Sequence, residues 1–146
     1  MTNEVGSEKF AVAATIDPDE LSVSTHVSDG VDMSLFESAT AIGMVGTLAS
    51  GSTVICKIMS GSNNVAFGNT VVTADTLSQA ETDADKQAVL NVRGEDLTPG
   101  DRYIRLEMVV GTAVADGGGV VLGHNPRYSP ASDNDLATVD SITNPT

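Results

Sequence analysis

The chain has no tryptophan, and its aromatic residues are two tyrosines and three phenylalanines among 146 residues. A hydrophobic core must therefore be built from valine, isoleucine, leucine, alanine and methionine, since 40% of the residues are hydrophobic. Carbohydrate-binding sandwiches commonly stack sugars on exposed aromatic rings. The scarcity of such rings disfavours a sugar-binding platform.

Cysteine is also nearly absent. The single Cys56 excludes an intrachain disulfide and a cysteine-based zinc site. It lies in the apolar run of residues 54–56, which predicts a buried, unreactive thiol. The first residues lack the basic and apolar regions of a signal peptide, and no segment has the roughly 20 apolar residues that span a bilayer. We expect synthesis in the cytoplasm and no membrane partner.

Cations are few: 7 lysines and arginines stand against 20 aspartates and glutamates, a formal net charge of −13. This balance argues against nucleic-acid binding, which needs cations to neutralise phosphates, and against anionic membrane surfaces. Two interpretations of the acidity remain open. It serves solubility, with salt screening the self-repulsion, or it marks a surface that faces a basic partner. We favour the first.

Catalytic motifs are missing as well. The two histidines, His26 and His124, lie far apart in sequence, and no Gly-x-Ser-x-Gly motif marks a nucleophile. The glycine run at residues 116–119 lacks the lysine that follows in a phosphate-binding loop. We expect no enzymatic activity, no catalytic residue and no cofactor. An enzyme would require a pocket that joins one of the histidines to several acids.

Two acidic clusters bear on metal binding. Asp17, Asp19 and Glu20 form one, and Asp133 and Asp135 the other. Carboxylate oxygens suit Ca²⁺, but neither cluster has the loop of an EF-hand. Solvated turn acids are the favoured interpretation, and no metal ligand is assigned.

What the sequence does contain is β-strand periodicity. In residues 102–110, Ile104, Leu106, Met108 and Val110 alternate with polar positions, which predicts a strand with one face in a core. Residues 87–93 alternate in the same way. Further strands are expected over residues 10–16, 21–27, 39–48, 53–60 and 120–123. Residues 17–20 are expected to end the first of these, residues 39–48 to be covered on both faces, and residues 116–119 to be a flexible turn.

The connection between residues 93 and 102 has a recognisable pattern. Leu97 precedes Pro99 and Gly100, and Tyr103 follows at the start of the next strand. This spacing is similar to the tyrosine corner of Greek-key sandwiches, in which the tyrosine hydroxyl bonds to upstream backbone and clamps the arch. The alternative is a tight hairpin with an incidental tyrosine. In both cases Tyr103 has a structural role.

Seven or eight strands separated by turns about every 8–12 residues predict an all-β fold, an antiparallel β-sandwich of Greek-key, immunoglobulin-like or jelly-roll-like topology. We expect a flexible N-terminal segment at residues 1–8, the sandwich at residues 9–126 and a C-terminal arm at residues 127–146.

Candidate subunit contacts lie in two places. In the arm, Leu136, Val139 and Ile142 recur at every third position, which is typical of one or two helical turns that dock on a neighbouring subunit. The small residues at 39–46 are a second candidate. The alternative is that both groups pack within the monomer.

Several segments together resemble a known group of proteins. They are residues 31–36, Gly46, residues 53–58, 86–89 and 102–106, and they end near residues 130–132. In this pattern, which covers residues 28–133, the chain resembles small virion proteins encoded among the head genes of tailed bacteriophages. It departs from the pattern after Ser60, where residues 60–63 replace an acidic turn, and this leaves the function of that loop open.

The resemblance implies a β-sandwich decoration or cement protein on the outer surface of a siphovirus-like head. Its partner would be the major capsid protein, and it would form a homo-oligomer, either a trimer or another symmetric cluster. Two alternatives remain open: a receptor- or glycan-binding module of a head or tail fibre, and a structural component of the tail or neck.

Overall fold

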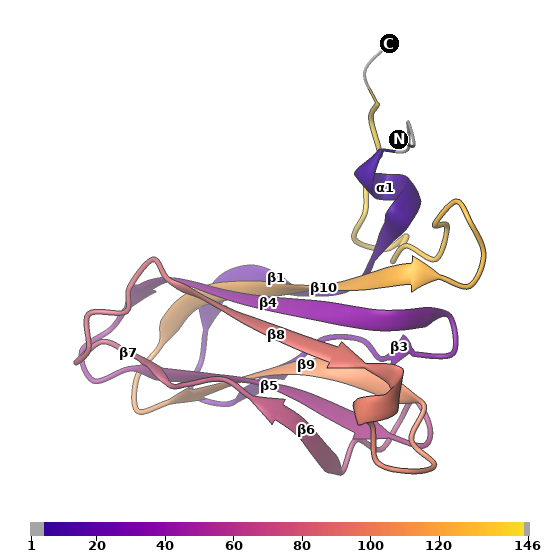
Figure 1. Ribbon diagram of the computed structural model, residues 1–146. Helices are drawn as coiled ribbons and strands as arrows, with labels where there is room; N and C mark the ends of the chain where they lie inside the picture. The colour runs from indigo at the N-terminus through magenta and orange to yellow at the C-terminus, as the bar shows by residue number, and fades with distance from the viewer. Residues whose placement is uncertain (1–4, 145–146) are drawn as a thin grey trace.

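The computed structural model describes residues 5–144, which form two antiparallel β-sheets packed face to face (Figure 1). Sheet A contains, in spatial order, β1 (Phe10–Leu21), β10 (Ala115–Pro126), β4 (Phe36–Leu48) and β8 (Gln87–Arg93). Sheet B contains β2 (Thr25–Val27), β9 (Tyr103–Gly111), β5 (Thr53–Gly61) and β6 (Asn69–Thr73); in addition, β3 (Val31–Asp32) pairs with β9 and β7 (Leu77–Ser78) pairs with β5. The predicted all-β sandwich is confirmed.

The strand order defines the topology. β2 with β3, and β6 with β7, act as two interrupted strands, which leaves the eight strands of a double-sheet jelly roll. β1 pairs with β10, β2 and β3 with β9, β4 with β8, and β5 with β6 and β7. Successive strands cross between the sheets except at the hairpin that joins β5 to β6. Of the topologies that the sequence left open, the structure has the jelly roll.

The core lies between the sheets and is built from alternate residues of each strand. In β9, Ile104, Leu106, Met108 and Val110 are all buried, as their spacing predicts. Neutral apolar side chains dominate this layer because burying each one stabilises the fold by roughly 1.5–3 kcal/mol. Cys56 joins them, and its burial raises the thiol pKa to about 11. The prediction of a buried cysteine is confirmed.

The first strand is longer than predicted. Residues 17–20 do not end it; β1 runs through them to Leu21, with a break in register between Ile16 and Asp19 opposite β10. Proline is tolerated here because β1 is at the edge of sheet A and Pro18 lies at the irregularity. The acids of residues 17–20 therefore stand on a strand and not in a free turn.

The glycine run at residues 116–119 was expected to be a flexible turn, and this is wrong. The turn between β9 and β10 comes earlier, where Thr112 has a φ of 68°, and β10 is continuous from Ala115. The glycines are required by packing, since a Cβ on Gly119 would lie 2.6 Å from Cδ2 of Leu106 in the opposite sheet.

The central strand β4 is covered on one face, not on both. Ala39, Ala41 and Val45 point into the core, whereas Met44 on the other face is about half exposed. A Cβ on Gly43 would collide with the Cys56 sulfur. The small residues of this strand therefore allow sheet B to approach, and those at 39, 41, 43 and 45 pack within the monomer instead of forming subunit contacts.

The first and the last described residues lie at one end of the sandwich (Figure 1). Residues 1–4 of the expected flexible segment lie outside the described residues, and Gly6–Lys9 forms the short helix α1. α1 and the C-terminal segment of residues 127–144 rise together from the end of sheet A (Figure 1). The strands themselves span Phe10–Pro126.

An ion pair holds β3 to the start of β9. Arg102 donates from Nε to Oδ1 of Asp32 at 2.8 Å and from Nη2 to Oδ2 at 2.6 Å, and the Ser34 backbone N–H donates to the same carboxylate. The Arg102 guanidinium, and then the Ser34 amide, lower the pKa of Asp32 from 3.8 to about 2 against the opposing effect of burial.

This shift predicts acid sensitivity. Because the folded pKa of Asp32 lies below the unfolded one, the stabilisation is fully present above about pH 4 and is lost as the pH falls through about 2. We expect a loss of about 1 kcal/mol, since the half-exposed Arg102 is screened by solvent. Urea denaturation over this range should show a smaller decline for Asp32→Asn than for the wild type. The exposed-acid control Asp75→Asn should follow the wild type, and an unchanged decline in Asp32→Asn would contradict the assignment.

Candidate functional site

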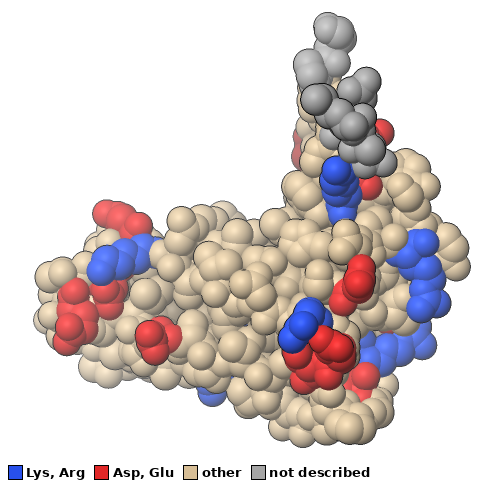
Figure 2. Space-filling model, in the orientation of Figure 1, with Lys and Arg blue, Asp and Glu red and all other residues tan. Residues whose placement is uncertain are grey.

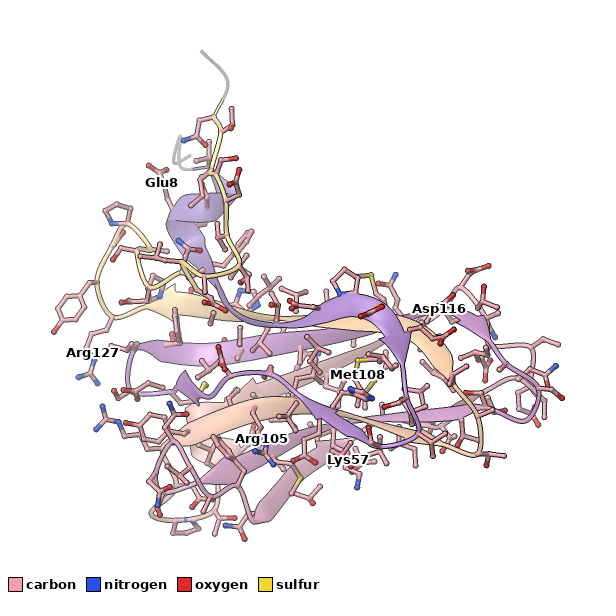
Figure 3. All side chains as sticks on the ribbon, turned by 180° about the vertical axis from the view of Figure 1, so that it is seen from behind. Glu8, Lys57, Arg105, Met108, Asp116 and Arg127 are labelled. Atoms are coloured by element: carbon pink, nitrogen blue, oxygen red, sulfur yellow. The ribbon has the colours of Figure 1, made fainter. Side chains whose placement is uncertain are left out.

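A groove of about 660 Å³ opens on the outer face of sheet A, near the end opposite α1. Its floor is the glycine run of β10, one wall is residues 15–20 of β1, and the other is Met44, Val45 and Gly46 of β4. Thr138 of the C-terminal segment also lines it. Asp116, which marks this end of the molecule in Figure 3, stands at the beginning of the floor.

The floor of the groove is backbone because β10 has only glycines at residues 117–119. A Cβ on Gly118 would lie 2.9 Å from Cα of Pro18, so the irregular part of β1 rests directly on this glycine. The neighbouring Gly117 and Gly119 face the core. The apolar surface of the groove comes from the side chains of Pro18, Met44 and Val120 on its margins, whereas Ile16 and Val45 are buried and face the core.

The rim of the groove is acidic. Asp17, Asp19, Glu20 and Asp116 are exposed and line it. Asp19 also has a structural task, because its Oδ1 accepts a hydrogen bond from the Glu20 backbone N–H at 2.7 Å. No arginine or lysine lines the groove within the part of the chain that the structure describes. Lys86, which precedes β8, is paired with Asp83 at 2.7 Å.

Next to the groove, the outer face of sheet A carries two rows of uncharged residues that cross all four strands. One cross-strand row joins Thr15, Val120, Ile42 and Val89. The next row joins Val12, Leu122, Thr40 and Asn91. We call these eight residues and Met44 the uncharged face. Val89 is 56% exposed and Met44 48% exposed.

The outer face of sheet B is different. Lys57 lies opposite Glu107 in the β5–β9 register, and Arg105 donates from Nη2 to Glu107 Oε1 at 2.6 Å (Figure 3). The Arg105 guanidinium also covers the Phe67 ring at 4.7 Å. Figure 2 shows one side of the molecule, on which charged side chains gather towards the ends and the middle is largely uncharged.

The C-terminal segment follows the free edge of β1. The Asp135 backbone N–H donates to the Val12 carbonyl at 2.7 Å, and the Val12 N–H donates to Asn134 Oδ1 at 2.9 Å. A single turn follows, in which the Val139 N–H bonds to the Asp135 carbonyl. The segment therefore covers part of an edge strand that would otherwise offer unpaired backbone groups.

The predicted contact residues lie on this segment. Leu136 is 84% exposed and Ile142 51% exposed, while Val139 is half-buried. They form one turn and an extended tail in place of a regular helix. Their role between subunits remains a prediction, and their exposure leaves them accessible to a neighbour.

The predicted corner joins the two sheets, from β8 to β9. Leu97 is buried, and the Asp101 N–H bonds to the Thr98 carbonyl across Pro99 and Gly100. Gly100 has a φ of 95°, as a turn with proline before glycine requires. The Tyr103 ring lies 5.3 Å from the Arg102 guanidinium. Among the described residues no acceptor is found for its hydroxyl, so the clamping role of Tyr103 remains a prediction.

The two histidines lie on different sheets. His124 Nε2 contacts Thr40 Oγ1 at 2.9 Å on sheet A. On sheet B, His26 Nε2 contacts Ser24 Oγ at 3.1 Å and the Ser22 carbonyl at 2.9 Å. A polar hollow of about 440 Å³ does bring His26 near the acids of residues 17–20. However, no carboxylate in residues 5–144 is hydrogen-bonded to its ring, which a serine–histidine nucleophile needs for orientation.

The acidic clusters do not converge on a metal site in the described part of the chain. No group of three or more histidine, cysteine, aspartate or glutamate side chains there is arranged to hold an ion. Asp133 lines a separate polar hollow, where its Oδ2 is buried without a hydrogen-bond partner. None of the helices formed by residues 5–144 is long and apolar enough to cross a bilayer.

Sequence reasoning missed the groove. The acids of residues 17–20 and the glycines of residues 116–119 were both noticed, but as separate turns. The signal that joins them is the register of β1 with β10, in which Asp19 lies opposite Gly117 and Glu20 opposite Asp116. That pairing spans almost one hundred residues of sequence and leaves no local pattern.

Comparisons with known proteins give little further guidance. No protein-family model matches the chain, and no curated protein matches it. Among solved structures, a chain from the structure of infectious bursal disease virus, Gx strain, is similar, with 19% sequence identity and a TM-score of 0.42. The match covers 83% of this chain and 34% of the viral one, so this chain spans about a third of the length of that protein. A likeness this distant carries no conclusion about function.

Proposed function

We propose that this protein is a structural protein of a virus particle, and that it decorates the outer surface of a tailed-bacteriophage head by binding the major capsid protein. The resemblance of residues 28–133 to phage head proteins supports the proposal. So does the architecture, a rigid sandwich with a C-terminal segment whose apolar side chains reach solvent.

The observation that carries the proposal is the uncharged face. In a chain with a net charge of −13, two cross-strand rows without a single charge cross all of sheet A. Exposed apolar areas of this kind mark interaction sites, because water is released when they are covered. The uncharged face thus gives sheet A an area suited to contact with another protein.

The proposed mechanism needs no active site. A protein that binds the assembled shell better than its separate subunits stabilises the shell by mass action. Exposed Leu136 and Ile142 lie where a neighbouring copy can cover them. A symmetric homo-oligomer would repeat each contact around an axis of the head and add the binding energies of its copies.

The test is sedimentation of the purified protein with phage heads stripped of it, with isolated tails and with host cells. We expect saturable binding to heads at a stoichiometry that matches a symmetry axis of the shell. Val89→Glu, which places a charge on the uncharged face, should weaken head binding about tenfold. Val65→Glu, at an 85% exposed loop position, is the matched control and should bind as the wild type does.

The other outcomes separate the alternatives. Binding to tails alone would overturn the head assignment in favour of a tail or neck component. Binding to host cells alone would indicate a receptor-binding module. Equal head binding by both variants would show that the uncharged face is not the contact surface.

A further inference from the structure

We propose that the groove beside the uncharged face receives an extended, basic segment of the partner protein. Lysine or arginine side chains would lie with their aliphatic stems over the glycine floor and with their charged groups at the acidic rim. This inference rests on the proposed function and names the site and the chemistry of the contact.

The shape of the groove supports a side-chain stem in an extended segment. Its floor is strand backbone without side chains, and its margins are apolar at Pro18, Met44 and Val120. Long cationic side chains bury their methylene stems along such surfaces and keep the charged group in water. The groove is also continuous with the uncharged face, since Thr15, Met44 and Val120 belong to both. A partner on that face would reach the groove without a separate binding event.

The charges of the rim indicate that the bound segment of the partner is positively charged. Four carboxylates line the groove, and no cation among residues 5–144 does. The carboxylates of Asp17, Glu20 and Asp116 make no hydrogen bond within residues 5–144, so an incoming cation need not displace an existing partner.

The charge pattern of this chain argues against a second copy as the occupant. The segment best able to reach another molecule is the C-terminal one, and it carries Asp133, Asp135 and Asp140 without a lysine or arginine after Arg127. Placing these acids at an acidic rim would be repulsive. A partner with clustered lysine or arginine fits the groove, and such a partner also accounts for acids placed beside an uncharged surface.

The first experiment uses a fluorescent peptide of alternating lysine and valine as the probe, with anisotropy as the readout. The rim variant Asp17→Asn, Glu20→Gln, Asp116→Asn should bind it roughly tenfold more weakly than the wild type. Asp19 is left intact because its Oδ1 accepts a hydrogen bond from the Glu20 backbone N–H. The matched control Asp75→Asn, Glu81→Gln, Glu95→Gln makes the same change in net charge at exposed positions that do not line the groove, and it should bind the probe nearly as the wild type does. Equal weakening in both variants would show that net charge alone attracts the probe, and it would overturn the groove as a binding site.

A second pair of variants tests the floor and its margin. Met44→Lys introduces a cation into the groove and should weaken probe binding several-fold, whereas Val65→Lys places the same charge at an exposed loop position that does not line the groove and should have little effect. Equal effects would overturn the proposal. Self-association of the wild type that Met44→Lys abolishes in sedimentation velocity would also overturn it, since the groove would then bind a second copy.

The same rim variant, added to stripped heads, separates the two proposals. Head binding that weakens with the rim variant and not with its control supports both. If the rim variant binds heads as the wild type does, the groove is overturned as the contact site and the proposed function is unaffected. Absence of head binding by the wild type overturns the proposed function, whatever the peptide result.

Discussion

Replacing Leu106 by alanine should lower the free energy of unfolding by about 3 kcal/mol. Leu106 is completely buried in β9, and its Cδ2 reaches across the core to the backbone of Gly119 in β10. Truncation removes this contact between the two sheets and leaves a cavity that the rigid strands on both sides cannot close. Urea denaturation measures the change. Val89→Ala, at an exposed position of β8, should stay within about 0.5 kcal/mol of the wild type.

A double-mutant cycle checks the cause of this effect. Gly119→Ala alone should be destabilising by about 1–3 kcal/mol, because its methyl group would lie 2.6 Å from Cδ2 of Leu106. In the Leu106→Ala background that carbon is gone, and the added methyl group enters the vacated space. The double variant should therefore be more stable than the sum of the single effects predicts. Strictly additive effects would show that the two positions do not meet in the core.

Replacing Gly61 by alanine should be destabilising by about 3 kcal/mol. A Cβ at this position, at the end of β5, would overlap the carbonyl oxygen of Ala66. That oxygen cannot move aside easily, since the turn before it is held by Asn63, whose Oδ1 accepts the backbone N–H groups of Val65 and Ala66 at 2.9 Å each. A clash with fixed backbone is more destabilising than one with the end of a flexible side chain.

Gly68 provides the matched control for this prediction. It follows the same loop, but a Cβ there would meet no heavy atom within 4 Å, and its φ is not positive. Gly68→Ala should be neutral or stabilise the protein by up to about 1 kcal/mol through the loss of unfolded-state freedom. Thermal denaturation of the two variants side by side gives the comparison. Similar melting temperatures would contradict the close approach at Gly61.

The strands that the sequence predicted best are those with one buried and one exposed face. β8 and β9 were found with nearly correct bounds, since Leu90, Val92 and the four apolar residues of β9 alternate without interruption. The strand predictions failed where a residue type that usually ends strands is instead needed for packing. Pro18 lies in an edge strand and Gly118 in a central one. Both are accommodated because Pro18 packs directly against the backbone of Gly118, where a side chain would not fit.

The candidate site was less accessible to prediction than the fold. The acids of its rim and the glycines of its floor were both visible in the sequence, but their meaning depends on which strands are neighbours. Met44 was not singled out because it lies within a run of small and apolar residues, and only the packing shows that it faces solvent. Leu136 and Ile142 were singled out from spacing alone; the structure shows that both are exposed, and their contact with another subunit stays a prediction.

The sequence by itself determined that this is an all-β sandwich without a disulfide, with a core of aliphatic side chains and an acidic surface. Those properties follow from composition and from alternation with a period of two, which are local. Only the tertiary structure decided that the topology is a jelly roll, that two uncharged rows cross the outer face of sheet A, and that a groove with an acidic rim opens beside them. These features arise from pairings such as β1 with β10 and β4 with β8, and the partner of a strand is set by packing between residues that are distant in the chain.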